Sequence, residues 1–317
     1  MPDDIPRPVS NLKKWAFLAL KLLVVLVVLW ALRRTLLDGF EQLRGRQWSF
    51  DPFWLVASGL FYVLGLLPAG LFWRHILRRM GQDARLGETL RAYYIGHLGK
   101  YVPGKAMVVI LRTGLIRSHR VSTPLAAVSV FFETLTMMAV GAFVAALILA
   151  VAFQDQLLLC ALAFGLAVAS ALPTLPPVFR QILRLTRVGK RHPEIADQIE
   201  QFDLTTLLRG WIAMFVAWIL LGVSFWAVLQ SMGIPGPSLL RSLPGYVASV
   251  SLATVAGFLS LIPGGAFVRE AILTGITGPS LGEGVALVAA VVLRLVWLVS
   301  EMVISGMLYW FGRPRGE

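Results

Sequence analysis

Two short Pro-Gly segments interrupt apolar stretches of this chain, and there the backbone itself could take part in chemistry. The first contains Pro103 and Gly104, and the second contains Pro263, Gly264 and Gly265. Proline removes an N–H donor and glycine loosens the chain, so a helix broken at these points leaves N–H and C=O groups unpaired. Inside a membrane, such groups are tolerated only when they are buried in protein or line a wet cavity.

Three ionisable side chains lie within long apolar stretches: Glu133, Arg294 and Glu301. A charge at mid-bilayer costs about 2.5–3.5 kcal/mol on insertion scales, so each residue needs a structural or functional reason. Arg294 and Glu301 are seven residues apart and therefore share one face of a helix. Our sharper hypothesis is that Glu133 and Arg294 face each other and that the planar guanidinium of Arg294 binds a lipid phosphate. The alternative is a structural ion pair, or snorkelling of Glu301 to the membrane surface.

Charged residues also flank both breaks. Arg269 and Glu270 follow the second break and are expected to open a half-helix, whose free N–H groups and positive dipole end suit a phosphate. Glu270 could equally serve only as a cap of that helix. Lys100 and Lys105 bracket the first break, where they either meet anionic lipid head groups or are ordinary basic residues of the cytoplasmic side.

The histidine and tyrosines near the first break are interpreted structurally. His97 is expected to be a buried hydrogen-bonding residue rather than a proton carrier. Tyr93, Tyr94 and Tyr101 are expected to be anchors at the membrane–water interface, where tyrosine is enriched.

The sequence contains no catalytic or metal-binding constellation. Its four histidines are scattered, its one cysteine lies in an apolar stretch, and there is neither a nucleophile with a paired base nor a Walker A motif. We therefore expect no enzyme activity, no metal and no cofactor, and any transport would be passive or coupled to an ion gradient. The net charge of +12 would suggest nucleic acid in a soluble protein. Here the basic residues cluster between apolar stretches, so anionic lipids are the expected partners and nucleic acid is not.

The elements that must position these residues are membrane helices. The chain is 57% hydrophobic and 15% charged, whereas soluble domains are about 25% charged. Several apolar stretches approach the roughly 20 residues that cross a bilayer. Asp51 is expected to cap the second span, and Ser280 with Glu283 to form a capping box before the last. The expected spans cover about residues 15–37, 53–73, 124–150, 157–172, 211–229 and 284–311. We predict an all-α integral membrane protein with six transmembrane helices, or up to eight if the broken segments cross completely instead of re-entering.

The two breaks also resemble each other. The segment Val102–Val108 matches Ile262–Val268 at Pro, Gly, Ala and Val, and each segment precedes a long span with an ionisable residue near its middle. The sequence thus predicts one transmembrane domain, 1–317, with pseudo-repeats at 53–172 and 209–311. In the six-span arrangement the repeats are inverted, as in many transporters. A chance match between apolar segments, or ordinary interfacial turns, is the alternative.

Basic residues predict the orientation of the chain. Most lie in the N-terminal arm, residues 74–123, residues 174–209 and the C-terminus, all on one side in the six-span arrangement. Cytoplasmic loops carry the excess of Lys and Arg, so both termini are expected to be cytoplasmic. The arginines between residues 33 and 46 run against this assignment.

The second break with its flanks, Leu261–Ala271, resembles the Pro-Gly-Gly signature of the lysylphosphatidylglycerol synthase transmembrane (flippase-domain) family, in which Arg and Glu follow. The first break, Gly96–Lys105, is similar to the upstream element of that family. The resemblance covers nearly the whole chain in the order of its motifs and in hydropathy. It implies an inner-membrane protein linked to lipid translocation or to lipid-linked sugar pathways. The bifunctional synthases carry a cytosolic aminoacyltransferase domain after the membrane region, whereas this sequence ends six residues after the last expected span. We therefore expect a stand-alone member without synthase activity.

Three functions stay open on this basis. The first is a translocase that moves a phospholipid, an aminoacylated lipid or a lipid-linked glycan or isoprenoid between leaflets. The second is an accessory or scaffold subunit of a pathway that modifies lipids or glycans, for example hopanoid or glycolipid synthesis, in which the partner is a lipid-modifying enzyme or a second copy. The third, a membrane-embedded transferase, is disfavoured because no acid–base constellation stands out.

Overall fold

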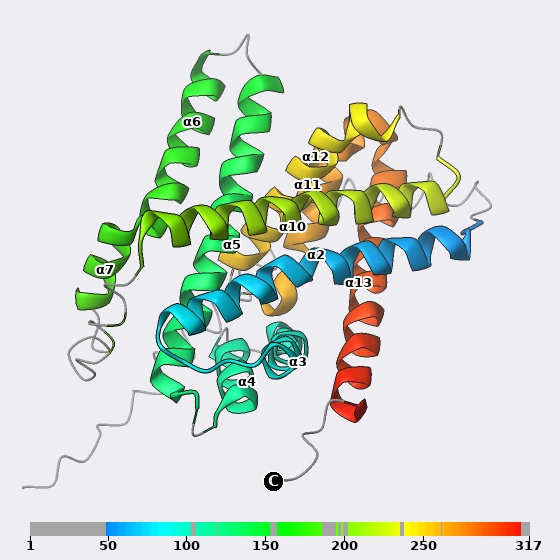
Figure 1. The fold of residues 1–317 in the computed structure, drawn as a ribbon. Helices are drawn as coiled ribbons and strands as arrows, with labels where there is room; N and C mark the ends of the chain where they lie inside the picture. The colour runs from blue at the N-terminus through cyan, green and yellow to red at the C-terminus, as the bar shows by residue number, and fades with distance from the viewer. Residues whose placement is uncertain are drawn as a thin grey trace, which may run out of the picture.

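The structure, a computed structural model, describes residues 49–102, 106–118, 120–152, 157–185, 195, 198, 202–234, 238–260 and 262–311. Figure 1 shows its helices in chain order. They are α2 (Pro52–Arg79), α3 (Leu86–His97), α4 (Ala106–Ile116), α5 (Thr123–Ala152), α6 (Leu157–Ala171), α7 (Pro176–Leu185), α10 (Leu204–Ser231), α11 (Leu239–Leu259), α12 (Val268–Leu281) and α13 (Glu283–Phe311). Three short 3-10 turns join them: η1 (Leu98–Tyr101), η2 (Leu172–Thr174) and η3 (Pro263–Gly265).

Five of these helices are long and apolar enough to cross a membrane: α2, α5, α10, α11 and α13. The segments Cys160–Thr174 and Pro176–Leu185, bent by 67°, form a sixth candidate together. The chain is therefore an all-α membrane protein with five to six candidate spans among its described residues. Five of the six expected spans coincide with these elements, and the expected span 15–37 lies outside the described residues. The full-length α11, with 21 residues, was not predicted as a span of its own.

Local hydrogen bonds set the helix ends. Of the two predicted helix caps, one is confirmed and the other is wrong. Asp51 caps α2 as predicted, because its Oδ1 accepts the N–H of Phe53 at 2.9 Å and proline occupies the first helical position. The predicted capping box at Ser280 is wrong. Ser280 lies inside α12 and donates its hydroxyl to the carbonyl of Thr277 at 2.9 Å. The chain then turns at Gly282, with φ 88°, before α13 begins.

The helices α2 and α10 lie side by side and run in opposite directions (Figure 1). Small and polar residues let them approach. The hydroxyl of Ser58 donates to the carbonyl of Ser224 at 2.8 Å, and the hydroxyl of Ser224 donates back to the carbonyl of Ser58 at 2.9 Å. Gly210 faces the ring of Phe72, where a Cβ would lie 2.3 Å from Cζ. This is how membrane helices associate, since lipid supplies no hydrophobic drive between them.

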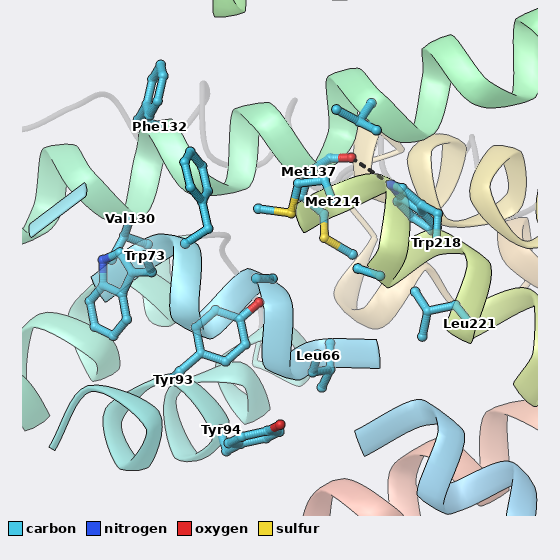
Figure 2. Packing of buried hydrophobic residues seen from close by; sticks show 14 of the residues in the cluster. Leu66, Trp73, Tyr93, Tyr94, Val130, Phe132, Met137, Met214, Trp218 and Leu221 are labelled. Atoms are coloured by element: carbon cyan, nitrogen blue, oxygen red, sulfur yellow. Dashed lines mark hydrogen bonds between the residues drawn. The ribbon is translucent and has the colours of Figure 1, made fainter. Parts of the chain in front are cut away.

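Aromatic side chains fill the core between α2, α3, α5 and α10 (Figure 2). The indole N–H groups find acceptors there: Trp218 donates to the carbonyl of Met137 at 3.1 Å, and Trp73 donates to the hydroxyl of Ser129 at 2.8 Å. Tyr93 and Tyr94 also belong to this core and are buried. They were predicted as interfacial anchors, and that prediction is wrong because their rings pack against other helices.

Each Pro-Gly break separates two helices that pack against each other, α3 from α4 and α11 from α12. The two hairpins differ in size, since α3 has 12 residues and α11 has 21. The second break therefore follows a complete candidate span, whereas the first follows a short helix. The antiparallel arrangement of α2 and α10 is what an inverted repeat requires, and the repeat itself stays a prediction.

Candidate functional site

The turns η1 and η3, which belong to the two breaks, lie against each other. Gly264 touches the first break directly, because a Cβ built on it would stand 3.1 Å from Cδ1 of Tyr101 and 3.1 Å from Nη2 of Arg294. Its φ of 60° is a left-handed conformation that favours glycine. At Gly265, with φ 65°, a Cβ would lie 2.8 Å from Cα of Gly257. The Gly-Gly pair thus allows the second break to close tightly against α11 and to meet the first.

A small cavity of about 40 Å³ lies where the breaks meet. This volume has room for a few water molecules, at about 10–15 Å³ each. Its walls come from η1, α11, η3, α12 and α13. The polar lining residues are Lys100, Tyr101, Thr254, Arg269, Glu270 and Arg294, and apolar residues, including Leu273, Leu293 and Trp297, complete the wall. A cavity with charged residues in its wall, set between two interrupted helical elements, is the arrangement that membrane transporters use for substrate and ion sites.

Arg294, on α13, forms an ion pair with Glu270, in the first turn of α12. Both side chains keep part of their surface open, 29% for Arg294 and 14% for Glu270. The second carboxylate oxygen of Glu270, Oε2, is buried and has no hydrogen-bond partner. The pair therefore spans the cavity wall with unused hydrogen-bonding capacity on its carboxylate.

Arg269 is the cation of this site that lacks a carboxylate. Its side chain packs on glycine, since a Cβ at Gly257 would lie 2.6 Å from its Cγ. Its Nε is buried without a hydrogen-bond partner, and the described residues give its guanidinium no ion pair. Arg269 is half-buried, and its unpaired Nε–H is a donor that an acceptor in the cavity could satisfy.

Glu301, also on α13, is buried with 1% of its side chain exposed. Its Oε1 accepts hydrogen bonds from the hydroxyl of Tyr62 and from Nζ of Lys100. Nζ of Lys100 also stands 3.2 Å from the hydroxyl of Tyr62 and 5.1 Å from the ring centroid of Tyr101. Three cations, Lys100, Arg269 and Arg294, thus meet two carboxylates, which leaves an excess of positive charge at the cavity.

Glu133 has a different partner from the one predicted. Its Oε2 accepts from Nη1 of Arg112 at 2.6 Å, and its Oε1 accepts from the hydroxyl of Tyr93 at 3.1 Å. The guanidinium carbon of Arg112 lies 3.9 Å from the ring centroid of Tyr93, as in a cation–π contact. The hypothesis that Glu133 faces Arg294 is therefore wrong, because each is paired elsewhere.

The structure brings five of the predicted charged site residues together. Lys100, Arg269, Glu270, Arg294 and Glu301 surround one cavity or contact its lining residues. Glu133 lies in the separate pair with Arg112. Pro103, Gly104 and Lys105 lie outside the described residues. Of the remaining predicted break residues, Pro263, Gly264 and Gly265 form η3.

Sequence reasoning missed Tyr62, Arg112 and Trp297. Arg112 is a charged residue in an otherwise apolar helix of 11 residues, and that signal could have identified it. Tyr62 and Trp297 stack with their ring centroids 4.5 Å apart, a contact between residues far apart in the chain that no local pattern indicates. Within the described parts of the chain, no group of three His, Cys, Asp or Glu side chains could hold a metal.

The family model described as the lysylphosphatidylglycerol synthase TM region matches residues 18–304. The chain belongs to this family. The match contains α2 to α12 and most of α13, so the cavity and the ion pairs Arg294–Glu270, Lys100–Glu301 and Arg112–Glu133 lie within the matched residues. The predicted family resemblance is thus confirmed. A comparison with curated proteins found no matching relative.

Proposed function

We propose that this member of the lysylphosphatidylglycerol synthase TM region family is a lipid translocase. It moves a lipid with a phosphate in its head group, such as a phospholipid, an aminoacylated lipid or a lipid-linked glycan or isoprenoid, between leaflets. The basic loops support a place in a bacterial-type inner membrane with both termini cytoplasmic. The observation that carries the proposal is the unpaired Arg269 beside a cavity with charged residues in its wall, between two broken segments.

Phosphate is the ligand that this chemistry favours. Arg269 and Arg294 offer planar N–H groups that match phosphate oxygens, and Lys100 adds a compact charge. The first turn of α12, a helix of 14 residues, adds free backbone N–H groups and the positive end of a helix dipole. A single negative charge between these groups would neutralise the excess positive charge at the cavity. We therefore assign substrate binding to Arg269 and Arg294, with Lys100 as their neighbour.

A phosphate head group needs more room than a few water molecules, so η1 and η3 must separate for a lipid to enter. The backbone at this point stores strain that such a movement would release. Phe267, which precedes α12, has φ 65° and ψ −37°, a conformation that costs a non-glycine residue about 1–3 kcal/mol.

Reconstitution tests the proposal. The purified protein is placed in phosphatidylcholine vesicles with trace amounts of fluorescent phosphatidylglycerol, aminoacylated phosphatidylglycerol or polyprenyl phosphate, and the fraction open to an added quencher is followed. Arg269→Gln should slow movement at least about tenfold, since a charge-assisted hydrogen bond contributes about 1.5–3 kcal/mol. The matched control is Arg241→Gln, which removes the same charge from an exposed position of the same hairpin and should move lipid like the wild type.

Two outcomes would overturn the proposal. Lipid movement no faster than in protein-free vesicles, for every lipid of the panel, would favour the accessory or scaffold function instead. A wild-type rate in Arg269→Gln would remove the site from the mechanism. Size-exclusion profiles and thermal unfolding of each variant separate a loss of function from a loss of fold.

A further inference from the structure

The carboxylate of Glu301 has one occupied and one empty oxygen. Its Oε1 accepts from Tyr62 and Lys100, whereas its Oε2 is buried and has no hydrogen-bond partner. A buried carboxylate is stable in its charged form only while a cation and hydrogen bonds compensate it. The charge state of Glu301 therefore depends on Lys100, and Oε1 becomes free for a proton when Lys100 leaves it.

Lys100 contacts both Glu301 and the cavity. Its Nζ pairs with Glu301, and its side chain lines the wall beside Arg269. An anion that enters the cavity competes with Glu301 for this ammonium group. When Nζ turns toward a phosphate, Glu301 loses its cationic partner, and burial then favours the neutral, protonated acid.

His97 is placed to deliver that proton. Its Nδ1 lies 3.4 Å from Nη2 of Arg112, and its Nε2 lies 3.8 Å from Oε1 of Glu301. A guanidinium can only donate, so Nδ1 must be the acceptor and the N–H of neutral His97 is on Nε2, on the side of Glu301. His97 has 21% of its side chain exposed and Glu301 has 1%, so His97 is the more accessible of the two to a proton from outside.

The other charged or titratable groups around this pair come from several elements. Glu301 faces Tyr62 from α2, Lys100 and Tyr101 from η1, Arg269 from α12 and, on its own helix, Arg294. His97 faces Arg112 from α4 together with Tyr93, Lys100 and Arg269. Because cations predominate, the surroundings oppose a lasting charge on His97 and favour its use as a relay.

From this geometry we infer that Glu301 binds one proton for each anionic head group that enters, with His97 as the relay. The inference rests on the proposed translocase function and adds its driving force. As the phosphate takes Lys100, Nδ1 of His97 gains a proton from water, the Nε2–H bond of His97 breaks, and an O–H bond forms on Oε1 of Glu301, so that His97 is neutral before and after the transfer. When the phosphate leaves, Lys100 pairs with Glu301 again and the proton is released. Head group and proton cross together, so the lipid follows a proton gradient without net charge movement.

A pH gradient across vesicles tests the coupling. Phosphatidylcholine vesicles with trace fluorescent phosphatidylglycerol receive the protein and a gradient of one pH unit, with potassium and valinomycin holding the membrane potential at zero. Coupling of one proton to one lipid predicts that the labelled lipid accumulates about tenfold in the leaflet on the alkaline side, since one pH unit corresponds to about 1.4 kcal/mol. Protein-free vesicles measure how fast the lipid redistributes unaided.

Three variants separate the roles in this experiment. Glu301→Gln keeps the shape and an acceptor oxygen but removes the proton site, so the lipid should end equally distributed. Glu301→Asp, which keeps the proton site, should restore part of the accumulation. His97→Gln should slow the approach to accumulation without changing the final ratio, because a relay changes the rate and not the equilibrium. The matched control is Glu283→Gln, the same change at an exposed position of the same helix, and it should accumulate lipid like the wild type.

The failures are distinguishable. No lipid movement by the wild type would overturn the translocase function itself. Movement that ends equally distributed in spite of the gradient would overturn the coupling and leave the translocase in place. Full accumulation by Glu301→Gln would exclude Glu301 as the proton site, and an unchanged rate in His97→Gln would exclude the relay.

Discussion

The two ion pairs Arg112–Glu133 and Arg294–Glu270 have similar settings with the charges reversed. Each joins the helix after a break to the long helix that follows, α4 to α5 and α12 to α13. The first pair is sealed, with 2% of each side chain exposed, and the second opens onto the cavity, with 29% and 14% exposed. The same arrangement thus provides a structural clamp in one half and an accessible site in the other.

The difference comes from what surrounds each pair. Glu133 receives further hydrogen bonds from Tyr93 at 3.1 Å and Thr134 at 3.2 Å, so both of its oxygens are occupied. Glu270 has one empty oxygen, whereas Nε is without a partner both in Arg269 and in Arg112, so the contrast lies in the carboxylates. A buried carboxylate with both oxygens occupied stiffens a fold, whereas one with an empty oxygen can exchange partners. A third pair, the exposed Arg79–Asp203, provides a reference, with 40% and 49% of the side chains open.

Breaking the sealed pair, Arg112–Glu133, is expected to cause the largest loss of stability. Arg112→Leu leaves Glu133 buried without its cation, and removing one partner of a buried pair costs about 3–5 kcal/mol. We expect a large drop in the unfolding temperature in detergent, or a failure to accumulate folded protein. The double variant Arg112→Leu with Glu133→Leu removes both charges and should recover most of the loss. If the single variant unfolds like the wild type, the pair is not a clamp and the comparison fails.

The sequence identified the charged residues near the second break, but it did not identify the residue that pairs with Glu133 near the first break. Arg294 and Glu301 were identified because a charge within a long apolar helix needs a reason, and their spacing of seven residues places both on one face of that helix. Asp51 was identified because capping is local. The partner of Glu133 could not be predicted in the same way, since Arg112 reaches it only through the fold of the α3–α4 hairpin. Tyr62 meets Glu301 across 239 positions of the chain, and periodicity says nothing about such a contact.

Substituting one glycine in each hairpin tests whether the α3–α4 hairpin, with the sealed ion pair, is more rigid than the α11–α12 hairpin, with the open one. At Gly99, a Cβ would lie 2.7 Å from the backbone nitrogen of Val108, whereas at Gly257 the three nearest atoms all belong to the side chain of Arg269. Gly99→Ala should therefore destabilise by about 1–3 kcal/mol, because backbone atoms of α4 must shift. Gly257→Ala should unfold near the wild-type temperature but move lipid more slowly, because it displaces Arg269.

The control for both is Gly114→Ala on α4, where a Cβ meets nothing within 4 Å. Alanine is the better helix former there, so this variant should be as stable as the wild type or more so. Equal stability losses in Gly99→Ala and Gly257→Ala would mean that the second hairpin is as rigid as the first. Normal lipid movement by a well-folded Gly257→Ala would show that the position of Arg269 does not matter.

Breaking the exposed pair, Arg79–Asp203, should cause the smallest loss of stability, and this loss should depend on pH. Hydrogen bonds from the backbone N–H and the hydroxyl of Thr206 hold the pKa of Asp203 below its usual value, and Arg79 lowers it further. A carboxyl group with a depressed pKa stabilises the fold above its unfolded pKa, about 3.9 for aspartate, and this contribution is lost as the pH falls through the folded pKa. The wild type should therefore lose stability below about pH 4, and Asp203→Asn should lose less over the same interval.

The matched control, Asp83→Asn, changes an exposed aspartate that caps no helix, and its pH profile of unfolding temperature should follow the wild type. If Asp203→Asn instead cost as much at neutral pH as the loss of Arg112, solvent exposure would not separate the ion pairs, and the contrast between a sealed and an open half would need another cause.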